Sequence, residues 1–420
     1  MKKLLVNRNR IELLLIITIF LVNIFVRFYN FDNRVTYGPE QARSLIVASG
    51  NIKNGPSLLG QEYFRYSSQG HKLFYSATFT YSLIPLILAF NYDYIGVAGY
   101  FALLNLITGL VVYLVTKKIA NRIAALFSLI FFLFNVYMIY HSLFLWPYNY
   151  LPLFGILSVY LCYLFQIQNR RVHPFVLGAV SGVGFGIQFL YLPYALAFLV
   201  YLLFKSHRKL TTFLAFFVGA VIGNLPMVLF DLRNNFYHLA TLVQYFVDTL
   251  NGISDASFNY YYLLPLWSIL SLVVGWFFYN LYRKSKLVAI VLSVSYIVLN
   301  LNSSLIDFEK PIGMADGLTW KEIRRAAEVI ADDRPRDFNV AVLLDFDTRG
   351  YILRYPIEYI HGFKPLGEEM YREAGAIYVL SRTDYNYRNP KVWELQVAYP
   401  YDIQILSEIG THYGVYKIIK

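Results

Sequence analysis

The chain has 420 residues, of which 57% are hydrophobic and 18% aromatic, while only 15% are charged. Soluble domains carry about 25% charged residues, so an ordinary soluble protein is excluded. The net charge of +11 is uneven: residues 1–305 hold 22 basic and 8 acidic side chains, whereas residues 306–420 hold 15 and 18. A basic excess confined to an apolar region is typical of cytoplasmic loops and lipid headgroup contacts, not of nucleic-acid binding.

An apolar run at residues 11–26 follows four basic residues and lacks a small-residue cleavage site after it. These features predict an uncleaved first span with a cytoplasmic N-terminus. Eight further apolar runs bring the expected number of spans to about nine; they cover residues 95–116, 123–140, 149–167, 174–190, 192–205, 211–230, 261–281 and 287–304. With this count, every short Lys- and Arg-rich loop lies on the side of the N-terminus. The sequence therefore predicts a multi-pass protein of the inner or plasma membrane.

Residues 31–93 form the first and longest outer loop of the membrane part, residues 1–305. Its last segment, Leu73–Phe90, is moderately apolar. Counting it as a span would invert every later loop, so we expect interfacial or re-entrant helices here. Of the eight acidic residues in 1–305, only Glu12 then lies near the inner side. Any carboxylate chemistry in this part is predicted to face outward.

Residues 306–420 have the composition of a soluble domain, which the span count places outside the cell. Thr319 is a candidate helix N-cap, with Glu322 completing a capping box. Strands and helices are expected in alternation: a helix at 319–332, a strand at 338–345, a helix at 348–359, and strands at 376–381, 403–409 and 415–419. The sequence predicts a small extracytoplasmic α/β domain. Asp345 to Asp347 are expected to be a strand end and a helix cap.

Glu40 and Arg43 lie three positions apart in the outer loop, so on a helix they share a face. The string Glu40-Gln41-Ala42-Arg43 resembles the Asp-Glu-Ala-Arg-like motif of the GT-C glycosyltransferases, especially those of the aminoarabinose transferase and protein O-mannosyltransferase type. Glu40 stands where that family has Asp, and Gln41 replaces its Glu. Leu58-Leu59-Gly60 follows at about the family's spacing. The resemblance covers about residues 1–300 and includes the order of first span, outer loop, further spans and outer domain.

The resemblance implies transfer of a hexosyl or pentosyl group, with inversion, from a polyprenyl-phosphate donor to a lipid, glycan or protein acceptor on the extracytoplasmic face. Glu40 suits the general base that takes the proton of the acceptor hydroxyl. Arg43 could orient Glu40 or bind phosphate. An ordinary surface pair on an interfacial helix is the alternative. Because Gln41 replaces the second acid of the motif, a metal-assisted mechanism is less favoured. No metal ligand is assigned, and the use of a divalent metal ion remains an open alternative.

Two further groups are candidates for substrate binding. His71 and Lys72 could bind phosphate at headgroup level, or flank an interfacial helix with snorkelling side chains. Trp146 and Tyr150 could stack on a sugar while Asn149 bonds a hydroxyl; an aromatic belt at the lipid interface is the alternative.

The last candidates lie on later outer connections. Tyr191 could contact substrate or belong to the aromatic belt. Asp231 and Arg233 could complete a cavity or pair with each other. Two other functions compete with glycosyl transfer: a transporter or flippase for lipid-linked sugars, and an inactive scaffold of cell-envelope assembly. Ion-coupled carriers place ionisable residues inside their spans, whereas the acids here fall on outer loops.

Overall fold

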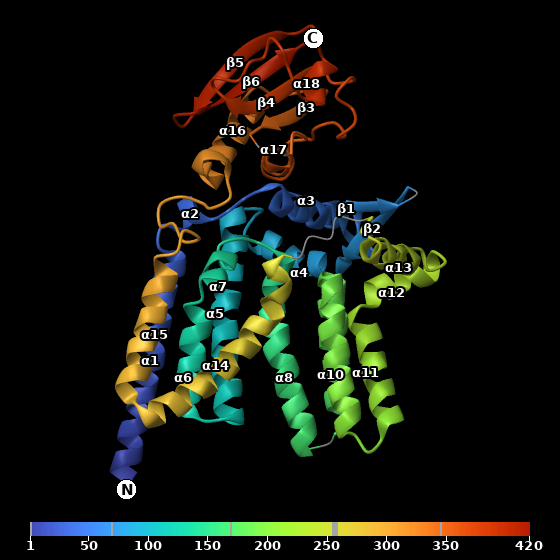
Figure 1. Cartoon of the computed structure of the whole chain (residues 1–420). Coiled ribbons are helices and arrows are strands. Elements are labelled where there is room, and N and C mark those ends of the chain that lie inside the picture. The colour runs from blue at the N-terminus through green and yellow to red at the C-terminus, as the bar shows by residue number, and fades with distance from the viewer. Residues whose placement is uncertain (1, 69, 169, 254–258, 345–346) are drawn as a thin grey trace. The chain divides into compact units, whose positions relative to one another are not determined.

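The computed structural model describes residues 2–68, 70–168, 170–253, 259–344 and 347–420 (Figure 1). The chain forms two compact units. The first comprises the residues through Tyr29, Pro56–Ser82 and Tyr100–Ile306; the second comprises Asn30–Gly55, Leu83–Gly99 and Asp307–Lys420. The chain enters the second unit for the last time after Ile306. The expected domain boundary, between residues 305 and 306, lies one residue earlier. The second unit also takes in two earlier segments that the sequence assigns to the membrane part.

The first unit is largely helical because its sequence is a series of apolar runs separated by short polar connections. Its long helices run roughly alongside one another (Figure 1). In chain order its helices are α1 (Lys2–Phe28), α5 (Tyr94–Ile119, beginning in the second unit), α6 (Arg122–Leu133), α7 (Val136–His141), η1 (Pro147–Tyr150), α8 (Leu151–Gln168), α9 (Val172–Ile187), η2 (Phe189–Tyr191), α10 (Leu192–Lys205), α11 (Lys209–Gly223), α12 (Leu225–Arg233), α13 (Tyr237–Leu250), η3 (Tyr260–Leu263), α14 (Leu264–Lys284) and α15 (Lys286–Leu301).

Among the described residues, four helical segments are long and apolar enough to cross a membrane: Arg10–Phe28, Tyr94–Ile119, Pro147–Gln168 and Tyr260–Lys284. The bent pair α11 and α12 would be a fifth. Five more apolar helices are shorter, at 10–17 residues. All nine predicted spans are mostly helical, as expected of a polytopic helical membrane protein. The number that cross the bilayer stays a prediction.

Two of the predicted spans are each divided into two helices. The span at 123–140 is interrupted after Leu133, because the Asn135 side chain accepts bonds from two backbone N–H groups of α7 and caps a new helix. The span at 211–230 ends at Gly223, and α12 leaves at an angle of 82°. Pro226 lies in the first turn of α12, where proline starts a helix but cannot continue one.

The segment 31–93, the predicted first outer loop, also differs from the prediction. It contains an antiparallel hairpin, β1 (Leu59–Ser68) and β2 (His71–Ser76), which the sequence analysis missed. The expected interfacial helix at Leu73–Phe90 is therefore wrong in its first turn, since Leu73 lies in β2 and the helix α4 covers Ala77–Ala89. The hairpin packs against α12 and α13, so it belongs to the first unit.

Arg27, in the last turn of α1, is completely buried. Its guanidinium donates to Asn23 Oδ1 at 2.7 Å, to Asn105 Oδ1 at 2.8 Å and to the Leu133 carbonyl at 2.9 Å. A buried cation at membrane depth is a functional candidate by default. Here amide and carbonyl oxygens bind its two terminal nitrogens, so Arg27 ties α1 to α5 and α6.

The second unit contains a four-stranded sheet in the order β3-β4-β6-β5, in which only β3 and β4 are parallel. Helices α16 and α17 lie together on one side of it (Figure 1). Its elements are α2 (Phe31–Arg34), α3 (Pro39–Asn54), η4 (Ala315–Gly317), α16 (Trp320–Asp332), β3 (Phe338–Leu343), α17 (Tyr351–Tyr355), η5 (Pro356–Ile360), β4 (Ala376–Arg382), α18 (Trp393–Gln396), β5 (Asp402–Ile409) and β6 (Tyr413–Ile419). The predicted small α/β domain is confirmed, including the Thr319–Glu322 capping box of α16. Of the predicted strand end and cap, residues 345 and 346 lie outside the described residues.

The helix α3, which carries Glu40 and Arg43, packs against α17 within the second unit. Trp320 of α16 fixes the neighbouring segments. Its Nε1 donates to Asp93 Oδ1 at 3.1 Å, and its ring lies 4.5 Å from that of Tyr37. Burial of such aromatic rings stabilises the packing. The C-terminal domain therefore holds the predicted motif helix in place.

Candidate active site

Glu40 lies in the first turn of α3, one residue after Pro39. Helix N-termini favour negative charge, so this position suits a carboxylate. The neighbouring Gln41 is buried, and its Oε1 accepts the Gly38 N–H at 3.0 Å. Gln41, which stands at the position of the second acid in the GT-C-like motif, thus caps the N-terminus of α3. Glu40 is left as the acid of the motif.

Arg43 lies one turn further along α3, half-buried. Its guanidinium carbon is 5.1 Å from the centre of the Tyr351 ring of α17, a cation–π distance. Burial and a hydrogen bond to Glu368 raise the pKa of Tyr351, so this phenol stays protonated at neutral pH. The contact fixes Arg43 within the second unit.

His71 and Lys72 lie on β2, not at a helix start as predicted. Lys72 Nζ is 3.2 Å from Glu62 Oε2 on the paired strand β1. The backbone N–H of Lys72 donates to the Tyr237 hydroxyl at 2.9 Å, and the ring centres of His71 and Tyr237 are 5.0 Å apart. Both side chains are exposed at one end of the hairpin beside the start of α13.

The aromatic loop before α8 is held by its own side chains. Trp146 stacks on His141 with ring centres 5.2 Å apart and planes at 4°, and lies 4.2 Å from Tyr148. Asn149 Nδ2 donates to the carbonyls of His141 and Phe144 at 2.7 and 2.8 Å. Asn149 Oδ1 is buried and has no hydrogen-bond partner among the described residues. That oxygen is the part of Asn149 left to accept a bond from a ligand.

Tyr150 and Tyr191 are both packed among helices. The Tyr150 hydroxyl lies 3.3 Å from both Ser82 Oγ and the Tyr100 hydroxyl. Tyr191 is only 1% exposed, and its hydroxyl is 3.3 Å from Ser158 Oγ. In this structure the Tyr191 ring fills the helix interface, not an open surface.

Asp231 and Arg233 lie at the end of α12 and do not pair with each other among the described residues. Asp231 Oδ1 accepts the backbone N–H groups of His238 and Leu239 at 2.8 and 3.2 Å. Asp231 thereby caps the start of α13. Arg233 is exposed. Asp231 therefore has a structural role, whereas the Arg233 side chain is accessible.

Within the first unit, β2 connects the other candidate groups. His238 Nε2 lies 2.7 Å from the Phe74 carbonyl, and the hydroxyls of Tyr75 and Tyr148 are 3.3 Å apart. The hairpin is thus bound both to the first turn of α13 and to the aromatic loop. The predicted residues form two groups: Glu40 and Arg43 in the second unit, and the others in the first.

The contact between His238 and β2 predicts a pH-dependent stability. Burial lowers the pKa of His238 and outweighs the opposing effects of the Phe74 carbonyl and Asp231. The unfolded chain then binds more protons than the folded one as the pH falls below about 6.5. We expect thermal unfolding to shift to lower temperature between pH 7.5 and 5.5, and to shift less in His238→Gln. An equal shift in both proteins would contradict this role of His238.

Asp248 is a buried acid whose surroundings the sequence analysis did not anticipate. It accepts the Tyr66 hydroxyl and Gln244 Nε2, both at 2.7 Å, and so links β1 to α13. The amphipathic pattern of residues 237–250 is the signal that could have found this helix. Within the described parts of the chain, no group of three or more His, Cys, Asp or Glu side chains could hold a metal ion.

Comparisons with known proteins agree with this architecture. The family model of dolichyl-phosphate-mannose-protein mannosyltransferases matches residues 79–230. The structure is similar to that of ArnT from Cupriavidus metallidurans bound to undecaprenyl phosphate, with a TM-score of 0.62 at 14% identity, over 96% of this chain and 97% of that one. The apo form of the same protein gives 0.54 at 13% identity, with the same coverage. Among curated proteins there is no match.

The similarity spans both units, so it includes the small C-terminal sheet as well as the helices. A shared fold at this low identity does not transfer the role of any single residue. The chain folds as a polytopic helical membrane protein with a first helix, a segment bearing Glu40, further apolar helices and a terminal α/β domain. The chain therefore shares the fold of ArnT, and its residues 79–230 match the family model of dolichyl-phosphate-mannose-protein mannosyltransferases.

Proposed function

We propose that this chain is an extracytoplasmic glycosyltransferase that moves a sugar from a polyprenyl-phosphate donor to a lipid, glycan or protein acceptor. The observation that carries the proposal is the placement of Glu40 in the first turn of α3 within a GT-C fold. The similar ArnT structure contains undecaprenyl phosphate, which supports a lipid-linked donor.

The proposed reaction is an inverting displacement. The acceptor hydroxyl oxygen forms a bond to the anomeric carbon while the bond from that carbon to the phosphate oxygen breaks. Glu40 takes the hydroxyl proton, and the polyprenyl phosphate leaves with the bonding electron pair. Positive charge near the leaving phosphate stabilises it. Arg43 is close in sequence to the base, and Lys72 and Arg233 are exposed cations of the first unit.

Lys72 and Arg233 are expected to bind the phosphate, not to take part in proton transfer. Lys72→Ala and Arg233→Ala should each raise the KM for the donor about tenfold, since a hydrogen bond to a charged group contributes about 1.5–3 kcal/mol. Initial rates at varied donor concentration measure this. The exposed Lys391→Ala in the C-terminal domain is the control. An unchanged KM in both variants would place the phosphate elsewhere.

An assay of sugar transfer distinguishes a glycosyltransferase from the two alternative functions, a flippase and a scaffold. Membranes containing the protein would be supplied with radiolabelled polyprenyl-phosphate sugars and candidate lipid, glycan and peptide acceptors. Label moving to an acceptor supports the transferase. Movement of intact donor between leaflets without transfer supports a flippase. Absence of both, with folded protein, supports a scaffold.

The proposed orientation places the N-terminus in the cytoplasm and Glu40 outside. Cysteine introduced at position 40 should react with a membrane-impermeant maleimide added to intact cells, whereas cysteine at position 118 should react only after permeabilisation. The native Cys162 is buried and would first be replaced by Ala. Labelling of position 118 from outside would invert the topology.

A further inference from the structure

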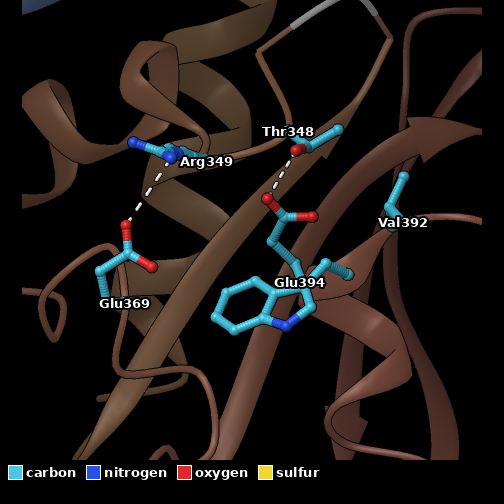
Figure 2. Close-up of a pocket in the computed structure, with 6 residues that line it drawn as sticks. Thr348, Arg349, Glu369, Val392 and Glu394 are labelled. Carbon is cyan, nitrogen blue, oxygen red and sulfur yellow. Dashed lines mark hydrogen bonds and ion pairs between the residues drawn. The ribbon is translucent and has the colours of Figure 1, made fainter. Parts of the chain in front are cut away.

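The C-terminal domain contains a cavity of about 410 Å³, and none of its lining residues takes part in the proposed transfer. It is lined by Thr348, Arg349, Glu369, Val392, Trp393 and Glu394. Figure 2 shows Thr348 beside Glu394 and Arg349 beside Glu369. The volume lies within the range of sites for small molecules, about 300–1,000 Å³.

Glu394 is the buried acid of this cavity, with only 6% of its surface exposed. Its Oε1 accepts the Thr348 hydroxyl at 2.6 Å. Its Oε2 has no hydrogen-bond partner among the described residues. Oε2 itself is not fully buried, so it can accept a further hydrogen bond from the cavity. The wall of the cavity therefore offers a fixed acceptor to a ligand hydroxyl or N–H group.

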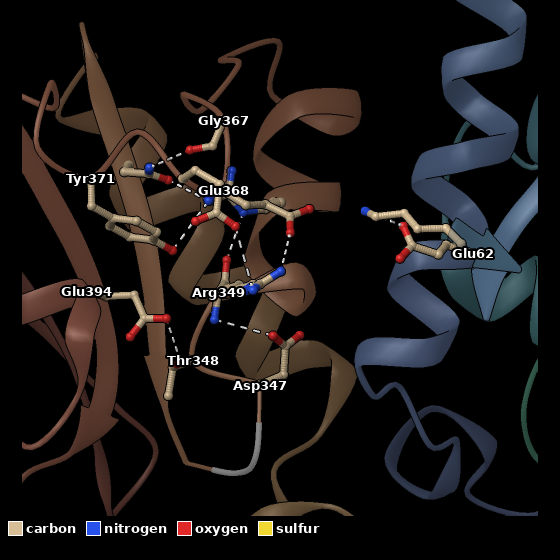
Figure 3. A network of polar contacts seen from close by, with 12 residues as sticks. Glu62, Asp347, Thr348, Arg349, Gly367, Glu368, Tyr371 and Glu394 are labelled. Atoms are coloured by element: carbon tan, nitrogen blue, oxygen red, sulfur yellow. Dashed lines mark hydrogen bonds and ion pairs between the residues drawn. The ribbon is translucent and has the colours of Figure 1, made fainter. Parts of the chain in front are cut away.

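Arg349 is held by surrounding acids. Its Nη1 is 3.1 Å from Glu368 Oε2 and its Nη2 is 3.6 Å from Glu369 Oε1. Its backbone N–H donates to Asp347 Oδ1 at 3.3 Å. Figure 3 shows Arg349 between Glu368 and Asp347. The guanidinium is thus paired with carboxylates, and the two carboxylates against one cation in the lining disfavour an anionic ligand.

Trp393 supplies an apolar surface to the cavity. It is 42% exposed, which is unusual for a tryptophan in a folded domain. Its ring contacts Tyr371 edge-on, with centres 5.6 Å apart. Tyr371 is fully buried and donates to the Val340 carbonyl at 2.8 Å. A buried tyrosine therefore orients the exposed indole.

We propose that this cavity is a saccharide-binding site separate from the transfer site. A sugar ring has an apolar C–H face that can lie on the indole of Trp393 and hydroxyl groups that can donate to Glu394. Thr348, through its hydroxyl, and Arg349, through its remaining N–H groups, can bond further hydroxyl oxygens. A free phosphate or acidic headgroup would meet Glu369 and Glu394 instead.

Binding is measured with the full chain in lipid nanodiscs, without donor lipid, by saturation-transfer difference NMR. The probes are methyl glycosides of glucose, mannose, galactose, glucosamine and N-acetylglucosamine. At least one probe should bind, and Trp393→Leu and Glu394→Gln should each weaken it about tenfold or more. Ile405→Ala and Glu373→Gln, exposed residues outside the cavity, should bind like the unaltered protein.

Glu40→Gln should also bind the probe unchanged, so this inference can fail or succeed independently of the proposed transfer. Unaltered thermal unfolding of Glu394→Gln shows that lost binding is not lost folding. Three results would overturn the inference: no probe binds, the cavity variants bind as well as the unaltered protein, or a lysine-containing tripeptide amide occupies the cavity in place of the sugars.

Discussion

Replacing Glu40 by glutamine is expected to lower the rate of sugar transfer by about 10²- to 10⁴-fold, the usual contribution of a positioned general base. Glutamine keeps the shape and hydrogen-bonding reach of the side chain but cannot take the proton. The effect should fall on kcat, because the lost interaction exists only in the transition state. Single-turnover transfer from a radiolabelled donor measures it directly.

A purely structural role of Glu40 predicts a different outcome. A carboxylate in the first turn of a helix contributes about 0.3–1 kcal/mol to stability. Glu40→Gln would then lower the unfolding temperature slightly and leave transfer almost unchanged. Asp32→Asn is the matched control, since Asp32 is an exposed acid in the first turn of the preceding short helix. Equal rates for Glu40→Gln and the unaltered protein would remove Glu40 from the mechanism.

The sequence was sufficient for features that depend on local patterns. Apolar runs predict the helices of the first unit, and the capping box at Thr319 and Glu322 predicts the start of α16 to the residue. It was insufficient where a short segment takes its structure from its neighbours. The hairpin β1–β2 is polar and rich in tyrosine, so it lacks a clear alternation, and contacts with α12 and α13 support it.

The candidate site shows the same limit. The pattern Glu40–Arg43 correctly placed both residues on one helix. Nothing in the spacing indicated that Asp231 would cap α13, because the N–H groups it binds come seven and eight residues later. Nor did it indicate the cavity at Glu394, which depends on bringing Thr348 and Glu394 together from segments far apart in the chain.

The helices α9 and α11 are packed backbone to backbone through glycines. A Cβ atom built on Gly178 or Gly182 would lie 1.9 or 2.1 Å from the carbonyl oxygens of Phe216 and Ala220. Gly219 and Gly223 make the reciprocal contacts with α9. The four-residue spacing in both helices is a known signal for close packing in membranes. A hydropathy profile alone does not reveal this glycine spacing.

Gly182→Val is therefore expected to lower the free energy of unfolding by about 3 kcal/mol or more, because two rigid backbones must separate and lose contacts along their length. Its unfolding temperature in detergent should fall by about 5 °C or more, with more aggregated protein on gel filtration. Ala197→Val, at an exposed position on α10, also introduces a valine into a helix but meets no neighbouring backbone, so it should melt like the unaltered protein. If Gly182→Val melts at the same temperature as that control, α9 and α11 do not approach each other this closely. The position of α12, which follows α11 and carries Arg233, would then rest on other contacts.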